Sequence, residues 1–388
     1  MLDGTVLGQV VDRDVYVSDP GYHYPAADFI ANSTQIASAA QLAISGGATI
    51  VWSGASAFDF GSGSGIVSIG YPERPNRIVH HSLLQEGPPI GEGVAVFTDS
   101  SPLGTPISIS LRFTEINCIP GHGAQLFSMN AGSGDVIINP LTVRDSFFGG
   151  MWFKYNPKAG STIAVDVGNC LFERGAFIID NSGYSGTDQA GIGLNLWNNL
   201  FFNNVNPDGG STRIILVASL SNNPNWNVTD NIFEGAKPNL PGGVGGNFGN
   251  NWFSNVSGWG QPNEKSGSAS YLKGPLGNRY QGNRAFQYQG SRSPSAAGLY
   301  QYTTRKDQKK DGEGAVGNGG NVDIGFHYVA VVEVTGVPVD SDGDGRADYS
   351  EDSDGNGAFD PSVGETSWTA FDGTGLTGNA LTLFTPLK

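Results

Sequence analysis

The chain has 388 residues, of which 58 are glycine and 38% are apolar, and its formal net charge is −15 at pH 7. This acidic balance speaks against nucleic acid or an anionic membrane surface as a main partner, and no apolar run is long enough to span a bilayer. Seven tryptophans and 21 phenylalanines argue against disorder, so the chain has a core, either one long solenoid or two ordinary domains.

The first 31 residues contain strand-like patches and a turn that ends at Asp19-Pro-Gly-Tyr-His-Tyr-Pro25. The start of the chain, Met1-Leu-Asp-Gly-Thr5, lacks the basic and apolar regions of a signal peptide, so we expect none in this chain. We treat residues 1–31 as a leader or as the tail of a preceding module.

A helix is predicted next. Asn32-Ser-Thr-Gln35 has the arrangement of a capping box, and the apolar residues that follow it lie on one helical face. These residues are Ile36, Ala39, Ala40, Ala43 and Ile44. Gly46-Gly47 ends the predicted helix, and Ala48-Thr-Ile-Val-Trp52 is expected to be the first strand.

One four-residue phrase returns between about residues 141 and 260, with Asn or Asp at its first position and Phe at its fourth. The copies are Asp145-Ser-Phe-Phe148, Asn169-Cys-Leu-Phe172, Asn198-Asn-Leu-Phe201, Asp230-Asn-Ile-Phe233 and Asn250-Asn-Trp-Phe253. Asn117-Cys-Ile-Pro120 and Asn283-Arg-Ala-Phe286 are weaker candidate copies. The intervals of 24, 29, 32 and 20 residues between the Phe residues are typical of a solenoid. Because β-rich runs and Gly-, Asn- and Pro-rich turns separate the copies, we predict a parallel β-solenoid.

Stacking explains the phrase physically. Successive coils of such a solenoid lie about 4.8 Å apart, so equivalent side chains form ladders along its axis. We expect the Phe to stack inside the core. The Asn at the first position either bonds up and down its own ladder or occupies a left-handed turn. The two cysteines, Cys118 and Cys170, would lie two coils and about 10 Å apart, which predicts free buried thiols.

The helix, the Gly pair and the first strand resemble the opening of the pectin-lyase-like right-handed β-helix superfamily. The resemblance implies an all-β fold, a right-handed parallel β-helix over residues 32–330, with the short helix capping its open end. Asn321-Val-Asp-Ile-Gly-Phe-His-Tyr328 resembles the Asp-Ile-Gly-aromatic motif that closes many bacterial secreted β-helix repeat domains. A partial copy at Gly21-Tyr-His-Tyr24 suggests that residues 1–31 end a preceding module.

An acidic segment follows, over residues 331–367. Nine acidic residues and one Arg lie between Asp340 and Glu365, and these contribute −8 of the net charge. The first twelve residues have the spacing of an EF-hand-type calcium loop, with alternate carboxylates on a Gly-turned loop that converge on one point. Its predicted ligands are Asp340, Asp342, Asp344, the Arg346 carbonyl, Asp348 and Glu351.

A second loop starts at once. Its predicted ligands are Asp352, Asp354, Asn356, the Ala358 carbonyl and Asp360. The twelfth residue is Val363, so Glu365 or a carboxylate of the first loop must replace the missing ligand. No flanking helices are expected, and the tandem resembles the thrombospondin type 3-like repeats of bacterial extracellular proteins, which bind Ca²⁺. The alternative is an acidic linker without metal.

Two smaller segments complete the chain. Arg305, Lys306, Lys309 and Lys310 form a basic cluster, which we expect to be a solvated loop. Residues 368–388 include Ala380-Leu-Thr-Leu-Phe384, a candidate closing strand or a linker to a neighbouring module.

Candidate catalytic residues are sparse. Gly121-His122-Gly123 matches a polygalacturonase tripeptide, but the other motifs of that family are missing, so a turn histidine is the plainer interpretation. Glu173 and Glu234 each follow a core Phe and would lie about 10 Å apart on one face, near the upper limit for an inverting glycosidase.

Other residue types would serve a lyase or a sugar-binding site. Arg174 beside Glu173 could bind an anionic sugar, and Lys154 could act as a base. Trp152 and Tyr155 could stack against a sugar ring. Surface charges beside turns, and an ordinary strand at 151–155, explain the same residues equally well.

Two functions remain open at this stage. The first is a secreted or cell-surface module with a structural, adhesive or glycan-binding role, rigidified by Ca²⁺, whose partners are extracellular polysaccharides or neighbouring surface-protein modules. The second is a polysaccharide lyase or glycoside hydrolase. An enzyme should show convergent carboxylates or bases beside exposed aromatics in a groove, whereas a structural module should show flat faces of Asn, Ser and Thr. Fold alone does not decide between them.

Overall fold

The computed structural model describes residues 27–83, 95–99, 105–118, 124–128, 138–155, 162–180, 191–203, 214–217, 226–235, 238–239, 246–306, 310–311 and 320–371. Contacts divide the chain into a coil unit, Met1–Ala269 with Ile324–Phe326, and a tail unit, Ser270–Asp323 with His327–Lys388. The predicted features at residues 1–26, at Gly121-His122-Gly123 and at 372–388 lie outside the described residues.

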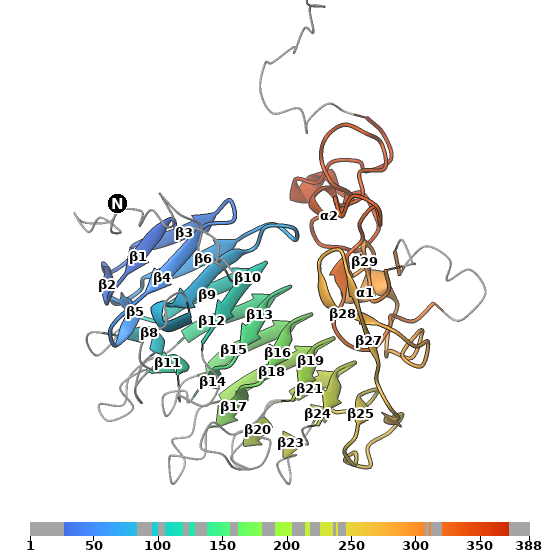
Figure 1. The fold of residues 1–388 in the computed structure, drawn as a ribbon, viewed down its shortest axis with the longest axis horizontal. Helices are drawn as coiled ribbons and strands as arrows, with labels where there is room; N and C mark the ends of the chain where they lie inside the picture. Colours follow the sequence, from blue (N-terminus) through green and yellow to red (C-terminus); the bar gives the residue numbers. More distant parts are fainter. Residues whose placement is uncertain are drawn as a thin grey trace, which may run out of the picture. The chain divides into compact units, whose positions relative to one another are not determined.

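Three parallel sheets make up the coil unit (Figure 1). Sheet A has ten strands: β1 (Phe29–Ala31), β4 (Thr49–Trp52), β7 (Asn76–His80), β10 (Thr114–Asn117), β13 (Phe147–Gly149), β16 (Leu171–Glu173), β19 (Leu200–Phe202), β22 (Ile232–Glu234), β25 (Trp252–Ser254) and β26 (Lys265–Ser266). Sheet B has eight: β2 (Thr34–Ile36), β5 (Ser56–Phe60), β8 (Ala95–Asp99), β11 (Gln125–Ser128), β14 (Trp152–Tyr155), β17 (Ala176–Asp180), β20 (Ile214–Val217) and β23 (Pro238–Asn239). Sheet C also has eight: β3 (Gln41–Ser45), β6 (Gly65–Ile69), β9 (Ile107–Arg112), β12 (Ile138–Arg144), β15 (Thr162–Gly168), β18 (Gly191–Trp197), β21 (Trp226–Thr229) and β24 (Gly246–Asn247). A short 3₁₀ helix, η1 (His81–Leu83), follows β7.

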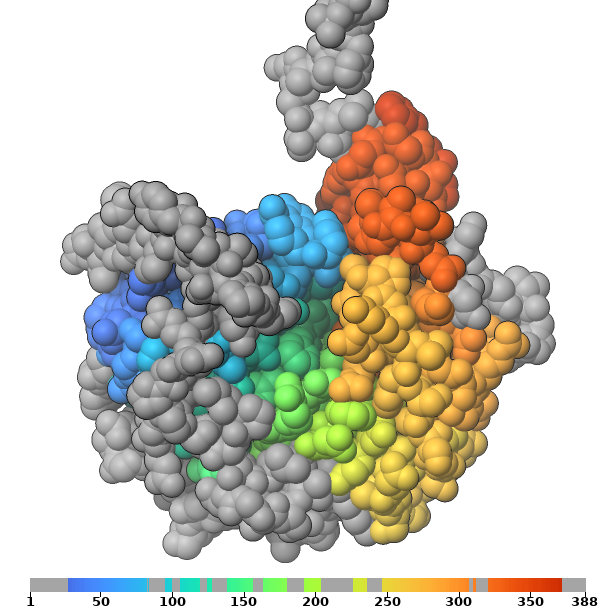
Figure 2. Space-filling model, viewed as in Figure 1, coloured from blue at the N-terminus to red at the C-terminus, as the bar shows by residue number. Residues whose placement is uncertain are grey.

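Neighbouring strands in most of each sheet are three apart in the sequence, so each turn of the chain adds one strand to A, one to B and one to C. The colours in Figures 1 and 2 accordingly run in sequence order along the coil unit, from blue to yellow. This arrangement is a parallel β-helix, which confirms the all-β solenoid predicted from the repeat.

The predicted phenylalanine ladder forms the centre of the core. The fourth-position rings of the five copies stack face to face, with centroids 5.0, 4.9, 5.1 and 5.4 Å apart from Phe148 to Phe253. These spacings follow the distance between parallel strands. The thiols of Cys118 and Cys170 are free and buried, as predicted, and burial raises the pKa of the Cys118 thiol to about 12.

The first position of the phrase is a left-handed corner between sheets C and A. All five copies have a positive φ there, from 50° at Asn169 to 62° at Asp230, so the turn interpretation is confirmed. First-position side chains also bond between coils, because Asn169 Nδ2 donates to Asp145 Oδ1 at 2.8 Å. A second hydrogen-bonded ladder runs through the second position. Asn231 Oδ1 accepts from the Asn199 backbone N–H at 3.0 Å, and Asn251 Oδ1 accepts from the Asn231 N–H at 3.0 Å. The interior is therefore tied together at this corner by buried amides.

The predicted N-terminal helix is wrong. Residues 32–45 contain β2 and β3, with Thr34, Ile36, Leu42 and Ile44 buried in alternation. Ala39 has a φ of 59°, which a helix does not allow. The apolar residues of this segment fit a period of 2 as well as 3.6, and pairing of β3 with β6 decides for strands.

Two boundaries and two candidate copies also differ from the prediction. The coil begins before residue 32, because β1 already pairs with β4. Its last parallel strand in the described part is β26, so the β-helix ends near residue 266 and not near 330. The copy before Asp145 is the segment that starts at Phe113, with a φ of 46°, because Ile116 pairs with Phe148. Asn283-Arg-Ala-Phe286 lies in the tail unit and is not a coil.

The tail unit is built from short elements. They are the antiparallel pair β27 (Tyr271–Gly274) and β28 (Gly277–Gln281), the pair β29 (Tyr302–Thr303) and β30 (Tyr328–Val329), the helices α1 (Pro294–Ala297) and α2 (Asp348–Glu351), and the 3₁₀ helix η2 (Pro361–Val363). Tyr280 and Tyr328 stack with ring centroids 4.1 Å apart and join the two pairs.

The Asp-Ile-Gly-aromatic motif has a local explanation within the coil unit. The Gly325 N–H donates to the Asp230 carbonyl at 2.8 Å, beside the left-handed corner. Gly325 has a φ of 96°, and a Cβ atom there would lie 2.4 Å from Ile232 Cδ1. Only glycine meets both conditions, so the motif requires Gly at this position.

The amide ladder generates the first prediction. Asn231→Ala leaves the Asn199 N–H and the Leu196 carbonyl without their side-chain partners in a buried site, and we expect a loss of roughly 2–4 kcal/mol in the free energy of unfolding. Asn227→Ala, in the preceding strand β21 but half-buried and bonded outward to Asn195, should cost less than about 1 kcal/mol. Denaturant unfolding of both variants checks this, and equal losses would contradict the role of the ladder.

Candidate metal centre

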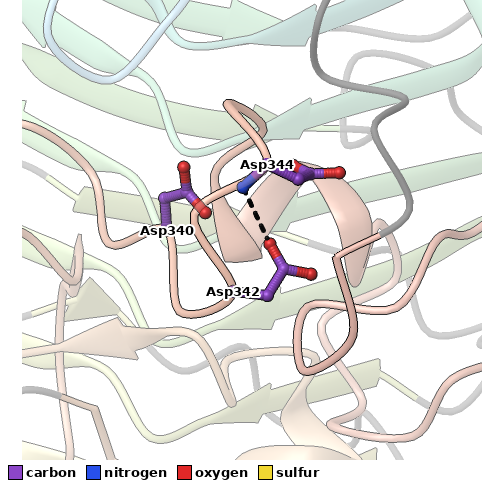
Figure 3. A group of neighbouring side chains, drawn as sticks. All are labelled: Asp340, Asp342 and Asp344. Atoms are coloured by element: carbon purple, nitrogen blue, oxygen red, sulfur yellow. Dashed lines mark hydrogen bonds between the residues drawn. The ribbon is translucent and has the colours of Figure 1, made fainter.

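Three carboxylates converge in the first acidic loop. One oxygen each of Asp340, Asp342 and Asp344 lies within 4.8 Å of the other two. The Asp344 N–H donates to Asp342 Oδ1 at 3.1 Å (Figure 3), and both oxygens of Asp340 accept from backbone N–H groups, of Gly343 at 2.7 Å and Gly345 at 3.0 Å. The glycines have φ values of 76° and 96°, and these left-handed turns curl the loop so that alternate side chains share one side.

The second loop repeats the arrangement with a different closing residue. Oxygens of Asp352, Asp354 and Glu365 lie within 4.8 Å of one another. Glu365 Oε1 accepts from the Asp354 N–H at 3.2 Å, and Oε2 accepts from the Asp360 N–H at 3.0 Å. The structure thus brings Glu365 to the place where the sequence lacked a twelfth ligand.

Buried carboxylate oxygens in both loops have no hydrogen-bond donor among the described residues. They are Asp344 Oδ2, Glu351 Oε2 and Asp352 Oδ1, on side chains that are at most 1% exposed. A buried ionised carboxylate without a partner is strongly unfavourable, and a cation offers the missing interaction. Hard oxygen donors in this number suit Ca²⁺, so these residues fit that ion.

The electrostatics of Glu351 agree with a site made for a cation. The pKa of the Glu351 carboxyl is raised to about 7, chiefly by burial and also by the charges of Asp342 and Asp344, against an opposing hydrogen bond from Thr366. Burial likewise raises the pKa of Asp352. Glu351 is not one of the three converging carboxylates of its loop, but the charges of two of them raise its pKa.

Two of the expected ligands have other partners. Asp348 accepts from Ser341 and from the Lys310 ammonium, so the structure does not bring it to the cluster. Asp360 caps η2 by accepting from the Ser362 N–H. The N–H groups of Arg346 and Ala358 donate to Asp344 Oδ1 at 2.8 Å and Asn356 Oδ1 at 2.6 Å. The carbonyls of these two residues stay predicted ligands.

Two residues from outside the acidic segment hold the loops, and sequence reasoning missed both. Gln301 Nε2 donates to Asp352 Oδ2 at 2.8 Å, and Lys310 pairs with Asp348. The prediction that Lys310 belongs to a solvated loop is wrong, because its side chain is 3% exposed. No local sequence pattern predicts these partners, because they lie 51 and 38 residues away from the carboxylates they bind.

A second buried polar group in the tail unit was also not anticipated. His327 Nε2 lies 2.8 Å from Asp311 Oδ2, and Thr304 Oγ1 donates to Asp323 Oδ2 at 2.6 Å. Burial, and then the charge of Asp311, raise the pKa of Asp323 to about 7. The only signal in the sequence was the Asp and His of the Asp-Ile-Gly-aromatic motif.

The candidate catalytic carboxylates lie on sheet A, in the register predicted for them. Glu173 pairs with Phe202, and Phe202 pairs with Glu234, so the two carboxylates are two coils and about 10 Å apart on one face. The ring of Phe202 occupies the position between them in the ladder. Arg174 follows at an exposed left-handed corner, with a φ of 54°.

The proposed sugar-binding residues belong to a different sheet. Trp152 and Lys154 are half-buried on the outer side of β14 in sheet B. Tyr155 points into the core, is 2% exposed, and its hydroxyl donates to the Ile138 carbonyl at 3.1 Å. The prediction that Tyr155 stacks on a sugar is therefore wrong.

Comparison with known proteins found no match to this chain, either among protein-family models or among curated proteins. The parallel β-helix is thus established from the structure itself. The resemblances to pectin-lyase-like and thrombospondin type 3-like proteins stay predictions from the motifs.

The raised carboxyl pKa values predict a pH dependence in chelator. The folded-state pKa of Glu351 is about 7 against an ordinary 4.5, so the folded protein holds a proton more tightly, and stability is lost as pH rises from about 4.5 through 7. We expect the melting temperature to fall over this range. Glu351→Gln should remove part of the slope, because Asp323 and Asp352, whose pKa values are also raised, contribute in the same direction.

Saturating Ca²⁺ should flatten the same profile, because the ion favours the ionised carboxylates. Differential scanning calorimetry at several pH values, with chelator and with Ca²⁺, measures both effects. A wild-type slope that Glu351→Gln leaves unchanged would contradict the assignment.

Proposed function

We propose that this chain is a non-catalytic β-helix module of a secreted or cell-surface protein, with a structural, adhesive or glycan-binding role, and that Ca²⁺ rigidifies its acidic segment. One observation carries the calcium part of the proposal. Each acidic loop gathers three carboxylates, and buried oxygens of Asp344 and Asp352 lack a hydrogen-bond donor among the described residues.

The negative charge of the segment supports the binding of a cation. Nine acidic residues and one Arg lie between Asp340 and Glu365, and carboxylates held within 4.8 Å of one another repel. Calcium takes six to eight oxygens, so ions in these loops would offset the repulsion. The free energy of calcium binding then becomes free energy of folding for the tail unit.

The outer face of sheet C supports a structural or adhesive role. One row of half-buried polar residues crosses it in register: Ser110, Thr142, Asp166, Asn195 and Asn227. Asn195 Nδ2 donates to Asp166 Oδ1 at 3.2 Å, and Asn227 Nδ2 donates to Asn195 Oδ1 at 2.7 Å. A flat face of Asn, Ser and Thr is what we expected of a structural module.

Membrane insertion finds no support in the helices. Within the part of the chain that the structure describes, no helix has the length and apolar character needed to cross a bilayer. The motif resemblances are what suggest extracellular polysaccharide or neighbouring modules of a surface protein as partners.

Calcium binding is tested by calorimetry with ligand-residue variants. We expect the wild-type chain to bind two ions in isothermal titration and to gain about 2.7 kcal/mol per site at a hundredfold excess over Kd. Asp344→Asn and Asp354→Asn should each lose one ion, because each removes a converging carboxylate. Glu333→Gln, whose side chain is 58% exposed in the same unit, is the matched control. A wild-type melting temperature that Ca²⁺ leaves unchanged would sink the calcium proposal.

The competing enzyme function rests on the shared face of Glu173 and Glu234. Its test is incubation with acidic and neutral polysaccharides, with assays for new reducing ends and for unsaturated products. We expect no product from any glycan. Release of product that is abolished in Glu173→Gln and Glu234→Gln, but retained in Glu115→Gln on the same sheet, would overturn the non-catalytic proposal.

A further inference from the structure

Lys310 is a buried ammonium group at the edge of the first acidic loop. Its side chain is 3% exposed and that of its partner Asp348 is 2% exposed, with Nζ 2.5 Å from Oδ2. The sequence placed Asp348 at the ninth ligand position of the loop, but both of its oxygens are used within the protein. Oδ1 accepts from the Ser341 N–H at 2.7 Å, and Oδ2 accepts from the Ser341 hydroxyl at 2.6 Å as well as from Lys310.

These bonds fix the shape of the loop. Ser341 lies between Asp340 and Asp342, two of the converging residues. Its bonds to Asp348 therefore hold the beginning of the loop against the end of the loop. The Asp348 N–H also donates to the Val339 carbonyl at 2.8 Å. The two ends of the loop are therefore joined through the Asp348 carboxylate, and the charge of this carboxylate is neutralised by Lys310.

The second loop is held differently. Its first residue, Asp352, accepts from the neutral amide of Gln301, and the Tyr300 N–H donates to the Gly355 carbonyl at 2.9 Å. Within the described part of the chain, Asp352, Asp354 and Glu365 form no ion pair with a lysine, arginine or histidine. Among the described residues, Tyr300 and Gln301 thus bind the second loop and Lys310 binds the first, and of these three only Lys310 carries a positive charge.

We propose that Lys310 is a positioning residue, a built-in counter-ion that holds the first loop in its closed shape without Ca²⁺, whereas the second loop depends on the ion. The claim that the second loop depends on Ca²⁺ rests on the proposed function. The claim that Lys310 holds the first loop closed does not. A buried carboxylate that loses its cationic partner is strongly destabilised, so loss of Lys310 opens the first loop unless Asp348 is neutralised as well.

Hydrogen–deuterium exchange of the full chain, resolved by mass spectrometry, tests the proposal. In chelator, wild-type peptides over 339–351 should exchange more slowly than those over 352–366. Lys310→Met should raise exchange over 339–351 at least about tenfold, since the opening equilibrium shifts by the cost of the unpaired charge. The double variant Lys310→Met/Asp348→Asn should recover most of the protection, because it removes both charges together.

Controls test the role of Lys310 separately from the calcium proposal. Lys306→Met, at an exposed lysine 3.9 Å from Glu333, should behave as wild type, and unchanged exchange of β15 and β18 in every variant shows that the coil unit stays folded. Wild-type protection over 339–351 in the Lys310→Met variant in chelator would overturn the proposal. If Ca²⁺ alters exchange in neither wild-type loop, the proposed calcium function fails, while the comparison in chelator still decides the role of Lys310.

Discussion

The fold depends on satisfying the backbone at the corner where sheet C turns into sheet A. A parallel β-helix buries this corner, and a buried backbone N–H needs a partner in every coil. A left-handed residue opens the corner in each copy of the phrase, and the residue after it points inward. In the last three copies that residue is Asn199, Asn231 and Asn251, whose amides pass hydrogen bonds from coil to coil. Because the corners align in this way, the fourth-position rings also stack in register.

The sequence predicted this part of the fold because the signal is local and repeated. Five copies share the same spacing between the Asn or Asp and the Phe. This spacing predicts the left-handed corner, the strand after it and the core position of the Phe. It failed at residues 32–44, where the apolar spacing fits both periods and the choice was made by pairing of β3 with β6. It failed again near residue 117, because Asn117 imitates the phrase while the corner is formed by Phe113.

In the acidic segment, too, local sequence spacing predicts some features, whereas others depend on contacts with distant residues. The spacing of Asp and Gly was enough to predict that Asp340, Asp342 and Asp344 converge, since neighbouring turns alone bring them together. The partners that decide which carboxylates are left for a metal come from elsewhere in the chain. Lys310 takes Asp348, and Gln301 takes one oxygen of Asp352. A motif identifies ligand types, but only tertiary contacts reveal which of them are already satisfied.

The two units solve one problem, the burial of polar groups, by opposite means. In the coil unit the buried amides are neutral and carry both donors and acceptors, so each coil satisfies the next and no outside ligand is required. In the tail unit the buried groups are carboxylates, which only accept, and Asp344 Oδ2 and Asp352 Oδ1 have no donor among the described residues. A site of acceptors alone is complete only with a cation. The physical basis for the proposed calcium dependence therefore lies in the tail unit, and we expect the stability of the coil unit not to depend on the ion.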